Sequence, residues 1–123
     1  MSQKAKILIV DDEPFNVDVL QQELEELNYQ IITAFNGQEA LDKIKNQQPD
    51  LILLDLMMPV LDGFSVLSEI KADNALRDIP VIIVSAADDS KTIVKGIKQG
   101  ADDYITKPVD ATHLVRKVKE YLG

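Results

Sequence analysis

Polar and charged side chains stand at the ends of several short apolar runs in this sequence. Asp11 and Asp12 follow ILIV, Asp55 follows LILL, Ser85 follows VIIV, and Lys107 follows YIT. Burying the charge of a carboxylate such as Asp55 costs several kcal/mol unless a cation or hydrogen bonds compensate it. If the runs are parallel strands, their carboxyl ends share one edge of a sheet, where α/β proteins form ligand crevices. We therefore expect these residues to line one pocket.

The chemistry of these residues predicts a metal-assisted phosphoryl site. Three carboxylates within reach of one another repel strongly, so they need a cation unless one of them is neutral. An all-oxygen ligand set without nearby His or Cys favours Mg2+, with Mn2+ as the alternative, over zinc. Lys107 and Ser85 have no role in a plain cation site, but a lysine charge and a hydroxyl donor suit a transferring phosphoryl group.

Hydrophobic periodicity predicts the elements that position these residues. Short runs rich in β-branched residues alternate with longer segments in which apolar residues recur every three or four positions. This (βα)5 alternation predicts a three-layer α/β/α sandwich around a doubly wound, five-stranded parallel sheet. Pro14 and Gly37 are expected to begin the first two helices, and Gly100 to end the fourth. The expected strands are Ile7–Val10, Ile31–Ile32, Leu51–Leu54, Val81–Val84 and Tyr104–Ile105.

Length and composition exclude several classes of function. The 123 residues are enough for about one domain, 1–123. With 13 Lys and Arg against 21 Asp and Glu, the net charge of −8 argues against direct binding to nucleic acid or to an anionic membrane surface. The chain has no cysteine, which fits a reducing compartment. The apolar run Ile7–Val10 is too short for a signal peptide or a membrane span, so we expect a cytoplasmic protein.

Four motifs also carry a family resemblance. In order and spacing, VDDE at 10–13, DLMMPVLDG at 55–63, VSA at 84–86 and DYITKP at 103–108 resemble the receiver domain of bacterial two-component response regulators. The resemblance covers essentially the whole chain and implies a flavodoxin-like strand order, 2-1-3-4-5. It also implies that Asp55 accepts a phosphoryl group from a histidine kinase or a histidine phosphotransfer protein.

The resemblance assigns roles to individual residues of the site. Asp12, Asp55 and the backbone carbonyl of Met57 would bind Mg2+ directly, and Asp11 would act through a water molecule. Lys107 would pair with Asp55 at rest and with the phosphoryl oxygens afterwards. In this reading the domain catalyses its own modification but turns over no small-molecule substrate.

The resemblance further implies a switch made by Ser85 and Tyr104. The Ser85 hydroxyl would move toward the phosphoryl group while Tyr104 turns inward, and the Lys107-Pro108 bond is expected to be cis. Phosphorylation would then shift the face formed by the fourth helix, fifth strand and fifth helix, which would bind a downstream protein, an effector domain or a second phosphorylated copy. Phe15 and Asn16 would face the kinase-side partner. The switch face is expected to present Lys91, Lys95, Lys98, Tyr104, Lys117 and Tyr121.

Three alternatives use the same fold. A flavodoxin-type FMN binder needs a phosphate loop after the first strand, where this chain has DDEPFN. A haloacid-dehalogenase-type phosphatase carries a second acid two residues after its nucleophile, where this chain has Met57. A degenerate receiver that only binds proteins would lack Asp12, Asp55 or Lys107, and all three are present.

Two further expectations concern signal lifetime and chain organisation. Met57 and Ala87 flank the expected path of the hydrolytic water and cannot orient it by hydrogen bonding. We therefore expect a phosphoryl lifetime longer than that of fast-cycling chemotaxis-type receivers. Both a stand-alone regulator and a receiver excised from a longer protein are compatible with the sequence.

Overall fold

The structure is a computed structural model that describes residues 4–58 and 61–123. Pro59 and Val60, which belong to the DLMMPVLDG motif, lie outside the described residues, as do residues 1–3. Five parallel strands form one sheet in the order β2-β1-β3-β4-β5, as predicted. The strands are β1 (Lys6–Val10), β2 (Gln30–Ala34), β3 (Leu51–Leu54), β4 (Val81–Ser85) and β5 (Asp103–Thr106).

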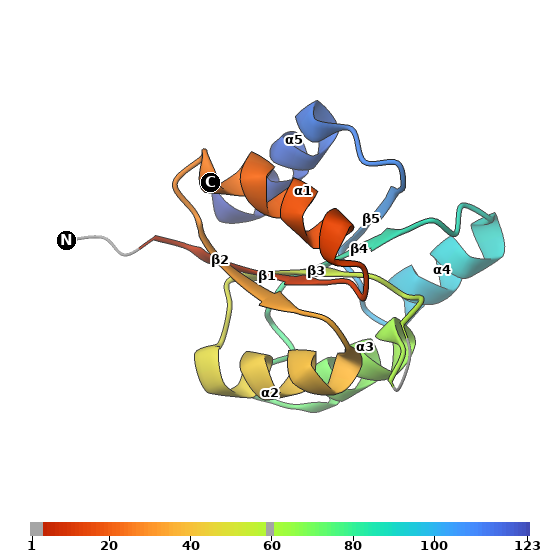
Figure 1. Cartoon of the computed structure of the whole chain (residues 1–123). Coiled ribbons are helices and arrows are strands. Elements are labelled where there is room, and N and C mark those ends of the chain that lie inside the picture. The colour runs from red at the N-terminus through yellow and green to blue at the C-terminus, as the bar shows by residue number, and fades with distance from the viewer. Residues whose placement is uncertain (1–3, 59–60) are drawn as a thin grey trace.

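Helices cover both faces of the sheet and make the predicted three layers. In Figure 1, α1 and α5 lie on one face, and α2 and α3 lie on the other. The α4 helix packs its buried Gly96 against Ile83, which belongs to the same apolar cluster as the residues under α2 and α3. The helices are α1 (Pro14–Glu25), α2 (Gly37–Gln47), α3 (Gly63–Ala72), α4 (Ser90–Lys98) and α5 (Ala111–Leu122).

The central strands are buried on both faces because their side chains alternate between two cores. Ile7 and Ile9 of β1 pack in one cluster with Leu24 of α1, while Leu8 and Val10 pack in the other. All four residues of β3 and all five of β4 are buried, as the continuous apolar runs predict. A polar side chain at a strand end is therefore surrounded by apolar packing on two sides.

Side chains and special backbone angles set the helix ends. Pro14 begins α1 and Asn36 caps α2, its side chain accepting a hydrogen bond from the Glu39 amide at 2.8 Å. Asp62 caps α3 in the same way through the Ser65 amide. Gly100 follows α4 with a φ of 112°, a left-handed angle that favours glycine.

Two further features bear on the expectations from sequence. The Lys107-Pro108 peptide bond is cis, as predicted. Within residues 4–58 and 61–123, no helix has the length and apolar character needed to span a membrane.

Candidate functional site

The residues that follow β1, β3 and β5 are held in place by backbone hydrogen bonds at the carboxyl edge of the sheet. The Asp11 amide donates to the Ala34 carbonyl at 3.1 Å, and the Asp55 amide donates to the Val10 carbonyl at 3.0 Å. The Lys107 amide donates to the Ser85 carbonyl at 2.8 Å. Each of these residues continues the strand register by one position, so its side chain starts from a rigid backbone.

Three carboxylates gather at this edge, as the strand ends predict. Asp11, Asp12 and Asp55 each offer one oxygen, and these oxygens lie within 4.8 Å of one another. Asp11 and Asp55 are only 2% and 5% exposed, whereas Asp12 is partly open to solvent. The donors are all hard oxygen atoms, so this cluster can hold a metal ion of the Mg2+ type.

Lys107 bridges the two buried carboxylates. Its Nζ lies 2.7 Å from Asp11 Oδ2 and 3.4 Å from Asp55 Oδ2. The expected pairing with Asp55 is present, but the shorter contact is with Asp11. Three carboxylates and one ammonium leave a formal charge of −2 on the cluster.

The hydrogen bonds distinguish Asp55 from Asp11. Asp11 accepts from the Glu13 amide at 3.0 Å and from Lys107 at 2.7 Å, so both of its oxygens have short contacts. Asp55 accepts from the Met57 amide at 3.3 Å and from Lys107 at 3.4 Å, and both contacts are long. Asp55 is therefore the less firmly held of the two buried carboxylates.

Burial and neighbouring charge shift the pKa values of the groups at this edge. Burial raises the pKa of Asp55 above its ordinary value of 3.8; the charge of Lys107 opposes this rise, and the charge of Asp11 adds to it. Burial alone would lower the pKa of Lys107, but its hydrogen bond to Asp11 and the two carboxylate charges raise it above its ordinary value of 10.5. Lys107 therefore remains a cation at neutral pH.

Ser85 and Tyr104 meet at the loop after β4, where both side chains form hydrogen bonds with Ala87. The fully buried Ser85 hydroxyl accepts from the Ala87 amide at 3.3 Å, and the Tyr104 hydroxyl donates to the Ala87 carbonyl at 2.6 Å. Burial raises the pKa of the Tyr104 phenol. The expected switch residues are thus brought together through Ala87, and Tyr104 is half-buried against the core.

Two features at this edge were not predicted from the sequence as part of the site. Gly63 begins α3, and a Cβ at this position would collide with the Asp55 carbonyl oxygen and the Leu56 Cα. An Asp-Gly pair is typical of a turn, and here the glycine also allows the backbone of Asp55 and Leu56 to approach closely. On the same side, Lys95 of α4 lies over the Phe64 ring, 4.1 Å from its centroid. No spacing in the sequence indicates that contact.

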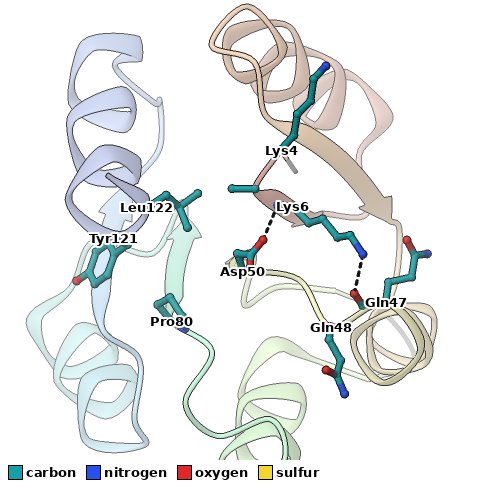
Figure 2. A pocket seen from close by; sticks show the side chains of 9 residues that line it. Lys4, Lys6, Gln47, Gln48, Asp50, Pro80, Tyr121 and Leu122 are labelled. Atoms are coloured by element: carbon teal, nitrogen blue, oxygen red, sulfur yellow. Dashed lines mark hydrogen bonds between the residues drawn. The ribbon is translucent and has the colours of Figure 1, made fainter. Parts of the chain in front are cut away.

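A hollow of about 680 Å3 lies at the amino ends of the strands, at the edge of the sheet opposite to the carboxylate cluster (Figure 2). Lys6 and Asp50 in this hollow are engaged in the fold: the Lys6 amide donates to Asp50 Oδ2 at 2.8 Å, and Lys6 Nζ donates to the Gln47 carbonyl at 3.3 Å. Lys6 thereby binds a terminal carbonyl of α2, where a cation is favoured by the helix dipole. This hollow is remote from the carboxylate cluster and serves no part of the chemistry described above.

The fold and the acidic edge define a class of signalling domain, and comparison with known families agrees. The response regulator receiver domain family matches residues 7–119, and the chain belongs to this family. It is therefore a receiver domain of the two-component type rather than a flavodoxin or a haloacid-dehalogenase-type phosphatase. Domains of this family act in signalling and are not small-molecule enzymes.

Individual relatives support the same assignment. The chain is 42% identical over 117 residues to the alkaline phosphatase synthesis transcriptional regulatory protein PhoP of Bacillus subtilis, covering 95% of this chain and 48% of that protein. Among solved structures it resembles the signal receiver domain of a histidine kinase from Syntrophus aciditrophicus, with 39% identity, a TM-score of 0.89 and coverage of 96% and 89%. It also resembles a receiver domain protein from Methanospirillum hungatei, with 32% identity, a TM-score of 0.90 and coverage of 98% and 94%. The chain spans about half the length, or less, of the curated relatives it matches.

Proposed function

We propose that Asp55 is the phospho-acceptor of this receiver domain and takes its phosphoryl group from a phosphohistidine of a histidine kinase or a histidine phosphotransfer protein. The observation that carries the proposal is the contrast between the two buried acids. Asp11 has two short contacts, whereas among the described residues Asp55 has only the long contacts to the Met57 amide and Lys107. A nucleophile needs a free oxygen lone pair, and Asp55 offers one at the mouth of the sheet edge.

In the proposed reaction an Asp55 carboxylate oxygen forms a bond to phosphorus as the bond from phosphorus to the donor imidazole nitrogen breaks. The electron pair of that bond stays on the imidazole, which takes up a proton. Lys107 lies close enough to Asp55 to follow the phosphoryl oxygens with a small displacement from Asp11. The role of the chain is thus to position charge around a transfer whose donor comes from another protein.

We assign the metal site to Asp12, Asp55 and the Met57 carbonyl, with Asp11 acting through water, and the ion to Mg2+, with Mn2+ as the alternative. The bound ion would offset carboxylate charge and allow an anionic donor to approach. The oxygen-only donor set and the formal charge of −2 support this assignment.

We further infer that Ser85 and Tyr104 convert phosphorylation into a change of the face formed by α4, β5 and α5. The hydrogen bonds to Ala87 join both side chains to the loop that leads into α4. A Ser85 hydroxyl drawn toward the phosphoryl group would release the Ala87 amide and so loosen the loop that Tyr104 also holds. The occupant of the switched face would be a downstream protein, an effector domain or a second copy of this domain.

The remaining assignments follow from charge and class. Phe15 and Asn16 of α1 would meet the phosphoryl donor, and the acidic chain is not expected to bind nucleic acid or membranes itself. We assign residues 1–123 to one receiver domain that acts in the cytoplasm. Its only catalysis would be the formation and slow hydrolysis of its own acyl phosphate.

The test is phosphorylation by acetyl phosphate with Mg2+, followed by intact-mass measurement. The parent protein is expected to gain one phosphoryl group, and Asp55→Asn is expected to gain none. Asp62→Asn is the matched control, because this acid lies in the same loop but serves to cap α3, a role that asparagine also fills. A parent that is never modified, or a modification that survives Asp55→Asn, would show instead a degenerate receiver or a different acceptor.

A further inference from the structure

The sulfur atoms of this chain are confined to three methionines, because it contains no cysteine. Two of them, Met57 and Met58, are adjacent in sequence but differ sharply in exposure. The Met57 side chain is 70% exposed, whereas Met58 is 9% exposed and packs in the apolar cluster under α2 and α3. An exposed thioether next to a buried one gives peroxide a single preferred target within this loop.

Met57 also lies at the carboxylate site. Its amide donates to Asp55 Oδ1 at 3.3 Å, which ties its backbone to the proposed acceptor. Met57 lines a hollow of about 560 Å3, and the largely buried Met58 also contributes to its wall. Asp12, Leu56, Asp62 and Phe64 complete the lining. Because Asp12 also belongs to the carboxylate cluster, this hollow adjoins the site where the phosphoryl group would stand.

We propose that Met57 is an oxidation site through which hydrogen peroxide shortens the lifetime of the phosphoryl group on Asp55. The sulfur lone pair attacks one peroxide oxygen, a sulfur–oxygen bond forms as the oxygen–oxygen bond breaks, and the second oxygen leaves as water after proton transfer. Sulfur is oxidised by two electrons and peroxide is reduced by two. The proposal rests on the proposed function, because it requires an acyl phosphate at Asp55.

The chemistry of the sulfoxide explains why oxidation of Met57 should accelerate hydrolysis of the acyl phosphate. A thioether is a weak acceptor that leaves the wall of the hollow apolar on this side, whereas a sulfoxide oxygen is a strong hydrogen-bond acceptor. A sulfoxide at position 57 can hold a water molecule beside the Asp55 phosphoryl group with its oxygen lone pair free for attack on phosphorus. One added hydrogen bond of ordinary strength accelerates hydrolysis about two- to tenfold.

The first test is the site of oxidation. After limited treatment with hydrogen peroxide, peptide mass mapping is expected to show Met57 sulfoxide forming at least about fivefold faster than Met58 sulfoxide, in line with their exposure. Equal oxidation of the two residues would overturn the assignment. This measurement needs no phosphorylation and is made on the unmodified protein.

The second test is the decay of the acyl phosphate before and after peroxide treatment, compared within each variant. In the parent and in Met58→Leu, the acyl phosphate is expected to decay about two- to tenfold faster after oxidation. In Met57→Leu, the decay rates before and after oxidation are expected to be equal. Methionine sulfoxide reductase should restore the original decay in the parent. Met57→Gln, whose amide oxygen imitates the sulfoxide, should decay faster than Met57→Leu without peroxide.

The outcomes separate this inference from the function on which it rests. Selective oxidation of Met57 with an unchanged or slower decay would overturn the inference alone, as would an acceleration that persists in Met57→Leu. A parent that never forms an acyl phosphate would overturn both, and the intact-mass measurement reveals that result before any peroxide is added.

Discussion

Replacing Lys107 by methionine should destabilise the metal-free protein strongly. Methionine keeps most of the side-chain length but removes the charge that lies 2.7 Å from Asp11 and 3.4 Å from Asp55. Both carboxylates are buried, so neither can exchange the lost partner for bulk water. The loss of unfolding free energy in this variant therefore measures the cost of burying two anionic side chains without their cationic partner.

The magnitude follows from removing one partner of a buried ion pair, which typically costs about 3–5 kcal/mol because the remaining carboxylates lose the charge that offset their burial. Protonation of Asp55 limits the cost, since neutralising a carboxyl of ordinary pKa 3.8 at pH 7 takes about 4.4 kcal/mol. The loss therefore lies between about 3 and about 4.4 kcal/mol, and we expect about 3.5 kcal/mol. For 123 residues this corresponds to a fall in Tm of roughly 13 °C.

The assay is thermal and chemical unfolding at pH 7 in the presence of a chelator. Lys117→Met is the control, because Lys117 contacts Asp103 at 3.0 Å on the surface of α5, where an ion pair contributes little. The loss in Lys107→Met should shrink as the pH falls and the carboxyl groups take up protons. If Lys107→Met and Lys117→Met lower the Tm equally, the electrostatic account of the site is wrong.

Three other predictions concern the same edge of the sheet. Mg2+ at a hundredfold excess over its Kd should stabilise the parent by about 2.7 kcal/mol, or roughly 10 °C in Tm, and Asp12→Asn should lose most of this shift. Because burial raises the pKa of Asp55, the metal-free parent should lose stability relative to Asp55→Asn as the pH rises above 3.8, and the difference should vanish below that pH in denaturant titrations. Gly63→Ala should prevent folding or lower the Tm by more than about 10 °C, since its Cβ meets backbone. Gly96→Ala, whose Cβ meets only the end of the Ile83 side chain at 2.5 Å, should cost far less in the same melting assay.

The strands that could be predicted well are those buried on both faces. The limits of β3 agree with its apolar run, and β4 differs from its run only by Ser85. The edge strands extend beyond their apolar runs, because polar residues are tolerated where one side of a strand has no neighbour. Thus β2 begins at the exposed Gln30, and β5 begins at Asp103 and ends at the exposed Thr106.

The residues that make up the site were predictable from the strand ends, but the choice of ion-pair partner for Lys107 was not. Parallel strands must bring Asp11, Asp55 and Lys107 to one edge, whatever their side chains then do. The preference of Lys107 for Asp11 depends on side-chain directions that no spacing encodes. The close approach of Gly63 to Asp55 likewise arises from the path of the loop before α3, which only the folded chain defines.

The position of Lys107 on Asp11 has a consequence for the order of events in the proposed reaction. If Lys107 leaves Asp11 to pair with a phosphoryl group, Asp11, which is 2% exposed, keeps the Glu13 amide as its one hydrogen-bond donor within residues 4–58 and 61–123. Phosphorylation also replaces one negative charge on Asp55 by two, so the cluster changes from −2 to −3 even with Lys107 present. Both changes favour a cation near Asp11 and Asp12 more strongly after transfer than before it. By linkage, a cation that binds the phosphorylated form more tightly shifts the phosphorylation equilibrium toward that form, and phosphorylation tightens the binding of the cation by the same factor.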